Sequence, residues 1–116
     1  MRRFRLDKRK AIKSNREFNE IFKTGQKAHS SHFMVLAKSA QDKRIGFTVS
    51  KRIKGSVKRN FAKRRLREIV RLNQQNLPDN KHLVFQAKQG IDRANFGALT
   101  REFQNLMDRF KATSLK

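Results

Sequence analysis

The chain contains no cysteine, few acidic residues and no long apolar segment, and each absence excludes a class of protein. Without cysteine it can form neither disulfides nor thiolate zinc sites. The longest apolar run is the segment 33–37, far short of the roughly 18 residues that a membrane span needs. No apolar stretch follows the basic N-terminus, so we expect no secretory signal. A cytoplasmic protein without membrane contact is therefore expected.

Positive charge is what the chain has in excess. Thirty Lys and Arg residues face nine Asp and Glu residues, which gives a formal net charge of +21. Self-repulsion at this charge opposes folding, so a polyanionic partner is expected to contribute stability. Nucleic acid, an anionic membrane and an acidic protein are the three candidates, and nucleic acid is the favoured one.

Hydrophobic periodicity predicts elements in the order α, β, β, α, β, α. Apolar helix faces need a sheet to cover them, which predicts one α+β domain over residues 1–116, built as a two-layer sandwich. Both faces of the first expected strand are apolar, so it is either covered on both sides or bends partway. We expect helices over residues 15–24, 57–74 and 93–111, and strands over residues 27–37, 45–50 and 81–88.

Several local signals mark where these elements begin and end. Ser14 followed by Glu17 fits a capping box, and Gly25 is expected to end the first helix. The polar residues 40–43 are typical of a hairpin connection between the first two strands. Residues 1–13 are strongly basic and either form a mobile arm or become ordered on RNA. Both interpretations of the arm stay open at this point.

The expected helix over residues 57–74 carries the most informative pattern. Seven of the fourteen residues 58–71 are basic and only Glu68 is acidic. Solvated surfaces usually mix both signs of charge, so this helix favours phosphate contact, which arginine makes at two points. A membrane surface or an acidic partner is the weaker alternative. At about 100° per residue, the basic face holds Asn60, Lys63, Arg64, Arg67 and Arg71, and the apolar face holds Ala62, Leu66 and Ile69, with Phe61 and Leu72 flanking.

No catalytic centre is visible in the sequence. A two-metal nuclease needs clustered carboxylates, whereas the acidic residues here are scattered. His29 and His32 would point to opposite faces of a strand, and His82 stands alone. There is no P-loop and no glycine-rich dinucleotide motif. We therefore expect no catalytic, cofactor-binding or metal-binding residue on this chain.

Three segments carry a resemblance to a known family. Residues 58–68 read KRNFAKRRLRE and resemble the RN-x-x-KR-x-x-R helix of the bacterial ribonuclease P protein component. Residues 46–52 resemble the central strand of that family, and residues 17–25 resemble its first helix and turn. The resemblance covers about residues 5–110. It implies a subunit of the ribonucleoprotein that removes the 5′ leader from precursor tRNA, with magnesium-dependent hydrolysis performed by the RNA.

The resemblance also implies a fold and a set of partners. The fold would be a sandwich with three helices and a small mixed sheet, whose strand–helix–strand crossover is left-handed, against the usual rule. The partners would be an M1-type catalytic RNA, which holds most of the magnesium, and precursor tRNA, with no obligate protein partner. Contacts to the catalytic RNA are expected from Lys51, Arg52, Lys58, Arg59, Asn60, Lys63, Arg64, Arg67 and Arg71.

The leader of precursor tRNA is expected, from the same resemblance, in a cleft between the first helix and the sheet. Phe18 and Phe22 would line this cleft above a floor of Phe33, Leu36 and Thr48. Spacing alone explains the first two as core residues, whereas a partly exposed Phe stacks a base for about 1–3 kcal/mol. Many relatives have Tyr where Leu36 stands, which leaves the role of Leu36 open.

Two other functions fit the composition. A ribosomal protein could place the basic helix in rRNA and use the Phe pair as core, and co-sedimentation with ribosomal subunits through high salt would favour it. A DNA-binding module could read the major groove with the same helix, and it would discriminate strongly between duplex sequences.

Overall fold

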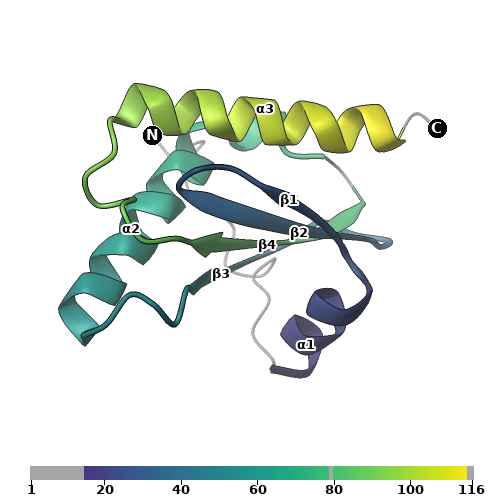
Figure 1. Cartoon of the computed structure of the whole chain (residues 1–116). Helices are drawn as coiled ribbons and strands as arrows, with labels where there is room; N and C mark the ends of the chain where they lie inside the picture. The colour runs from purple at the N-terminus through teal and green to yellow at the C-terminus, as the bar shows by residue number, and fades with distance from the viewer. Residues whose placement is uncertain (1–14, 79, 115–116) are drawn as a thin grey trace.

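The computed structural model describes residues 15–78 and 80–114 (Figure 1). The predicted basic arm over residues 1–13 and the predicted Ser14 cap lie outside this part of the chain. The expected order of elements is confirmed, with one more strand and a short 3-10 helix. The elements are α1 (Asn15–Thr24), β1 (Gln26–His29), β2 (Phe33–Ser39), β3 (Arg44–Val49), α2 (Ser56–Leu72), η3 (Gln74–Asn76), β4 (Lys81–Ala87) and α3 (Phe96–Ser114).

The segment predicted as one strand over residues 27–37 is a hairpin of β1 and β2. The two strands are antiparallel, and His29 lies opposite Met34. The reversal is closed at Ser30, whose backbone N–H and hydroxyl both donate to the carbonyl of Phe33, at 2.9 and 3.0 Å. The bend that the sequence left open is therefore a full turn. The turn contains no Asn-Gly or Pro-Gly pair, which would have been a local signal for it. For this reason the hydrophobic pattern did not separate the two strands.

The sheet has the order β1-β2-β4-β3, with β2 and β4 antiparallel and β3 and β4 parallel. The predicted hairpin at residues 40–43 is wrong, because β4 lies between β2 and β3. Backbone pairing between β2 and β4 continues for one residue into this connection. The Ala40 N–H donates to the carbonyl of Asn80, the residue just before β4, at 2.9 Å. Asp42 then accepts a hydrogen bond from His82 on β4, with 2.9 Å between Oδ1 and Nε2.

Helices cover both faces of this sheet, with α2 and α3 on one side and α1 on the other (Figure 1). The main core lies under α2 and α3, where the Phe85 ring stacks between Phe47 and Phe103 at centroid distances of 5.8 and 5.9 Å. A smaller cluster of Ile21, Leu36 and Val84 lies under α1. Burial of each such side chain contributes about 1.5–3 kcal/mol. Residues 33–37 of β2 are apolar on both faces of the strand, which agrees with its being covered on both.

The predicted α+β class, with three helices and a small mixed sheet, is confirmed, but the two predicted layers are three, because α1 packs on the sheet face opposite to α2 and α3. The segment β3–α2–β4 joins two neighbouring parallel strands, and the left-handed sense of this crossover stays a prediction. Within residues 15–78 and 80–114, no helix has the length and apolarity required to cross a bilayer.

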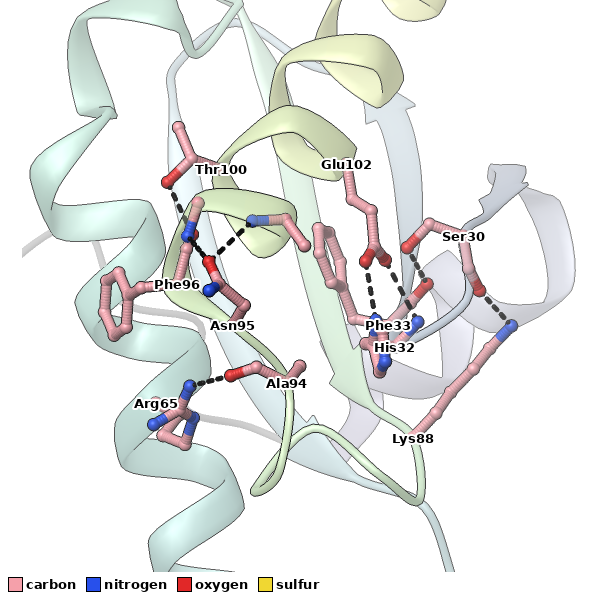
Figure 2. A network of polar contacts seen from close by, with 12 residues as sticks. Ser30, His32, Phe33, Arg65, Lys88, Ala94, Asn95, Phe96, Thr100 and Glu102 are labelled. Carbon is pink, nitrogen blue, oxygen red and sulfur yellow. Dashed lines mark hydrogen bonds and ion pairs between the residues drawn. The ribbon is translucent and has the colours of Figure 1, made fainter.

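The start of α3 differs from the prediction because a cap was overlooked. Asn95 Oδ1 accepts hydrogen bonds from the backbone N–H groups of Gly97 and Ala98, at 2.7 and 3.4 Å (Figure 2). An Asn in this position satisfies N–H groups that the first turn leaves free. The helix therefore begins at Phe96 and not at Arg93.

Candidate nucleic-acid interface

The predicted two-sided character of α2 is confirmed. Its buried residues are Ala62, Leu66, Ile69 and Val70, which pack on the sheet. Phe61 and Leu72, predicted to flank this side, are 45% and 40% exposed. The outer face of α2 consists of Asn60, Lys63, Arg64, Arg67 and Arg71, of which Asn60, Arg64 and Arg67 are exposed and the other two are half-buried.

An aromatic ring orients Arg67 on this outer face. The Arg67 Cζ atom lies 5.6 Å from the centroid of Phe47, which itself stacks on Phe85 in the core. A guanidinium over an aromatic face gains about 0.5–1 kcal/mol at an exposed position. The charge of Arg67 is thus held at the junction of α2 and β3, where it remains accessible.

Arg71 is joined to the one acidic residue of the helix. Its guanidinium donates to both carboxylate oxygens of Glu68, three residues earlier. These hydrogen bonds hold the pKa of Glu68 below its ordinary value and raise the pKa of Arg71. An RNA phosphate would have to compete with Glu68 for this side chain, so the contact expected of Arg71 stays a prediction.

Arg59 has a structural partner that the sequence did not reveal. Its Nη1 donates to the carbonyls of Ser50 and Ile53, both at 3.0 Å, and its Nη2 donates to the carbonyl of Val49 at 3.3 Å. The side chain therefore holds the connection between β3 and α2. A direct RNA contact by Arg59 stays a prediction. In the structure its hydrogen bonds stabilise the loop that carries Lys51 and Arg52.

Of the remaining predicted cations, Arg52 and Lys58 line a hollow that lies away from the outer face. Lys51 and Arg52 are exposed in the turn after β3. Lys58 and Arg67 are nine residues apart, which at about 100° per residue places them on opposite sides of α2. The hollow, which we call the loop pocket, has a volume of about 400 Å³, and its charged lining residues are Arg52, Lys54, Lys58, Asp92 and Arg93.

Two of these pocket residues were missed by the sequence reasoning. Lys54 belongs to the same basic run as Lys51 and Arg52, so the charge pattern could have included it. Arg93 follows β4 and precedes α3, and no local pattern connects it to the start of α2. Only the folded chain brings these residues together.

Arg65, which was not predicted as a site residue, faces α3. Its Nη2 donates to the carbonyl of Ala94 (Figure 2). Its Cζ atom lies 5.3 Å from the Phe96 ring centroid and 5.8 Å from that of Phe61. This basic residue therefore ties α2 to the start of α3.

Phe18 and Phe22 face the sheet from α1, as predicted. Both are half-buried and pack, with Met34, against the cluster of Ile21, Leu36 and Val84. Part of each ring is therefore engaged in packing and part remains accessible. The packing of both rings agrees with the interpretation as core residues, and base stacking on their accessible parts stays a prediction.

The predicted floor of this region needs a correction. Phe33 is fully buried in the main core on the opposite face of the sheet, so its prediction as a leader contact is wrong. Successive strand residues point to opposite faces, and Phe33 and Leu36 are an odd number of residues apart. Leu36 does lie on the α1 face, but it is also fully buried and presents no surface to a ligand.

Thr48 lies in a row of half-buried side chains that crosses this face. In the sheet register, Gln86 of β4 lies opposite both Met34 of β2 and Thr48 of β3. All three side chains are half-buried. Met34 and Gln86 were missed, although the period-two alternation of their strands could have placed them beside Thr48.

Glu20 of α1 and Asp42 of the connection between β2 and β3 both form ion pairs. Glu20 pairs with Lys38, and this hydrogen bond lowers the pKa of Glu20. Asp42 pairs with His82 and Arg44, which lower the pKa of Asp42. Among the residues that the structure describes, no three His, Cys, Asp or Glu side chains gather in a way that could hold a metal ion.

Known proteins are similar to this chain both in sequence and in fold. A family model described as Ribonuclease P matches residues 6–111. The ribonuclease P protein component of Geotalea uraniireducens is 33% identical over 111 residues, which cover 94% of this chain and 97% of the relative. The protein of the same name from Geobacter sp. is 36% identical over 97 residues, covering 82% and 83%.

Solved structures agree with these relatives. The RNase P protein from Thermotoga maritima matches with a TM-score of 0.74 and 28% identity, over 85% of this chain and 96% of that one. The RNase P protein of Staphylococcus aureus matches with a TM-score of 0.73 and 25% identity, over 88% and 95%. These matches favour the ribonuclease P interpretation over the ribosomal and DNA-binding alternatives. The chain belongs to the family of bacterial ribonuclease P protein components, which act with an RNA subunit in the maturation of tRNA 5′ ends.

Proposed function

We propose that this chain binds an M1-type catalytic RNA through the outer face of α2 and the leader of precursor tRNA through the α1 face of the sheet. One observation carries the proposal. Lys63, Arg64 and Arg67 have no ion-pair partner among the described residues, so three cations on one helix face lack a counter-charge. RNA phosphates supply that charge and bind arginine at two points.

The leader would run beside α1. Phe18 and Phe22 expose part of their rings over the half-buried row of Met34, Gln86 and Thr48. Base stacking on an aromatic ring does not depend on the identity of the base. Such a surface therefore suits leaders of varied sequence.

Bond cleavage would be performed by the RNA, with magnesium held mainly by it. Glu20, Asp42 and Glu68 each form an ion pair of their own, and the described carboxylates supply no cluster of oxygen ligands of the kind that a two-metal centre uses. The role of the chain would be electrostatic. A net charge of +21 placed between two polyanions lowers their repulsion, which reduces the magnesium needed for assembly. The complex would act in the cytoplasm and need no further protein.

The test is cleavage of precursor tRNA by the cognate RNA at low magnesium, with and without this chain. We expect faster cleavage when the chain is present, and the advantage should shrink as magnesium is raised, because metal ions then neutralise the phosphates. The double variant Arg64→Gln with Arg67→Gln should give only part of the increase in cleavage rate. If the chain gave no improvement at any magnesium concentration, the proposal would be wrong.

The two surfaces should separate by substitution. The double variant Arg64→Ala with Arg67→Ala is expected to weaken binding of the catalytic RNA. Phe18→Ala is expected to lower the affinity for leader-bearing tRNA about 5-fold or more and to leave the affinity for mature tRNA little changed. Affinities for the three RNAs measure this. Phe96→Ala removes an aromatic ring that is 36% exposed on α3 and is the matched control. Equal effects of both classes of variant on precursor and mature tRNA would contradict the division.

A further inference from the structure

The loop pocket is a concentration of positive charge that the outer face of α2 does not include. It lies between the turn after β3, the first turns of α2 and the connection from β4 to α3. Gln89 holds the two loops together, because its Nε2 donates to the carbonyl of Arg52 at 3.0 Å. The pocket is therefore a formed feature of the fold, and its volume falls within the range of about 300–1,000 Å³ typical of ligand clefts.

Four basic side chains line this pocket, and none has an electrostatic partner among the residues that the structure describes. Arg52, Lys54, Lys58 and Arg93 are all exposed, and their side chains make no ion pair or hydrogen bond within the described chain. Asp92, the one acidic lining residue, is also unpaired and so neutralises none of them directly. Like charges that converge without a counter-charge repel one another. An anion is the partner that would relieve this repulsion.

The floor of the pocket strengthens the attraction for an anion. It is made by Ile53, Ala62 and Ile91, which are 8%, 1% and 1% exposed. An apolar floor keeps water from one side of a bound group, and charge interactions are stronger where the local dielectric constant is low. Exposed cations above an apolar floor suit a phosphate group, which can remain partly hydrated on its outer side.

The pocket and the outer face lie on different sides of the same helix. Lys58 is about 180° from Arg67 around α2, and the buried residues Ala62 and Leu66 occupy the arc on the sheet side between them. A single extended RNA strand on the outer face would not reach the pocket without turning around the start of the helix. Two cationic surfaces separated in this way can hold two separate stretches of backbone.

We propose that the loop pocket binds phosphodiester groups of a second RNA segment, so that α2 is held between two stretches of RNA. This inference rests on the proposed function only in taking RNA as the partner. It assigns to Lys54 and Arg93 a binding role that the outer face does not require. The start of α2 then acts as a bridge, and the connection from β4 to α3 becomes part of the interface.

The test uses amide NMR of the full chain with two probes, a short oligouridylate and inorganic phosphate. The oligouridylate is expected to shift the Gly90 and Ile91 amides saturably. The double variant Lys54→Gln with Arg93→Gln should weaken this response at least about 5-fold and leave the Arg64 and Arg67 amide responses within about twofold. The double variant Arg64→Gln with Arg67→Gln should weaken the response of the amides at positions 64 and 67 and leave the Gly90 and Ile91 response within about twofold.

A matched control separates site binding from a general loss of charge. Lys27→Gln with Arg101→Gln also removes two exposed, unpaired cations and should weaken neither response by more than about twofold. Lys58→Gln gives a second variant at the pocket, should the first double variant be unfolded. Equal weakening of both responses by every double variant would overturn the proposal. A Gly90 and Ile91 response to inorganic phosphate but not to oligouridylate would also overturn it.

This experiment is independent of the proposed function as a ribonuclease P subunit. It uses neither the cognate RNA nor precursor tRNA, so failure of the cleavage test would leave its outcome intact. Conversely, loss of the pocket response would leave the outer face of α2 and its role unchanged.

Discussion

Single residues on α2 have different tasks although their charges are the same. Arg59 lies within the signature run, yet its guanidinium donates to three backbone carbonyls at the end of β3 and in the following turn. Arg65 is turned toward α3. Arg64 and Arg67 keep accessible charges. The role of each arginine follows from which acceptors surround it, and the side-chain type alone does not determine this.

Arg59→Gln is expected to destabilise the fold. The three carbonyls lose charge-assisted hydrogen bonds, which costs roughly 2–3 kcal/mol in the free energy of unfolding. Urea denaturation measures the change. Arg64→Gln removes the same charge from an exposed, unpaired position and should stay within about 0.5 kcal/mol of the parent. Similar losses in the two variants would mean that the carbonyl contacts contribute little.

Glu102 should make stability depend on acid pH. Burial raises the pKa of Glu102, but the Ser30 side chain and the hydrogen bonds from the ring and backbone of His32 outweigh it, and the pKa lies below its ordinary value. Figure 2 shows the two hydrogen bonds from His32. A lowered folded-state pKa gives stability above the unfolded value of about 4.3, and this stability is lost as the pH falls through the folded value.

Glu102→Gln tests this directly by thermal unfolding across pH. We expect a loss of about 1–3 kcal/mol at neutral pH that shrinks as the pH falls through the acid range, where the parent carboxylate takes up its proton. Asp108→Asn, an equal charge change at an exposed and unpaired position of the same helix, should show no such trend. A loss that stayed constant down to acid pH would contradict the assignment.

At the scale of elements, the join between α1 and β1 depends on a close approach of backbone. A Cβ atom at Gly25 would lie 2.6 Å from the carbonyl oxygen of Ile21 and 3.0 Å from that of Ala37. The sequence correctly predicted that the helix ends here. The packing shows why a side chain is excluded, because α1 and the end of β2 approach too closely for one.

Gly25→Ala is therefore expected to cost about 1–3 kcal/mol, since backbone on both sides must shift. Gly55→Ala is the comparison, because Gly55 has a φ of 89° but no atom within 4 Å of the added carbon. Its cost of about 1–2 kcal/mol comes from left-handed strain alone. Unfolding midpoints measure both variants. A Gly25→Ala protein as stable as the parent would show that the junction can open without cost.

At the scale of the whole molecule, the excess of positive charge should govern RNA affinity. If six to ten phosphates are contacted, affinity for the catalytic RNA falls by about 10³–10⁵ between roughly 50 and 200 mM salt, because counterions are released on binding. Filter binding over a salt series measures the slope. The Arg64→Ala and Arg67→Ala variant should reduce the slope by about two. An affinity independent of salt would exclude phosphate neutralisation as the main source of binding.

Much of the candidate interface was predictable because its signals are local. The one-signed face of α2 follows from residue spacing, and burial of Ala62, Leu66 and Ile69 confirms it. Helical spacing likewise predicted that Phe18 and Phe22 face the core, and both pack toward the sheet, whereas their contact with the leader stays a prediction. The floor was predicted less well, because Phe33 and Leu36 were assigned together although strand alternation separates them.

The sequence by itself determined the α+β class, nearly all the elements, the charge of α2 and the family, because periodicity, composition and motif spacing are properties of neighbouring residues. Only the tertiary structure decided that β4 lies between β2 and β3, that Arg59 holds a loop, and that Arg93 joins Lys54 around a pocket. These features depend on contacts between residues far apart in the chain, which are selected by burial and hydrogen bonding of the folded molecule as a whole.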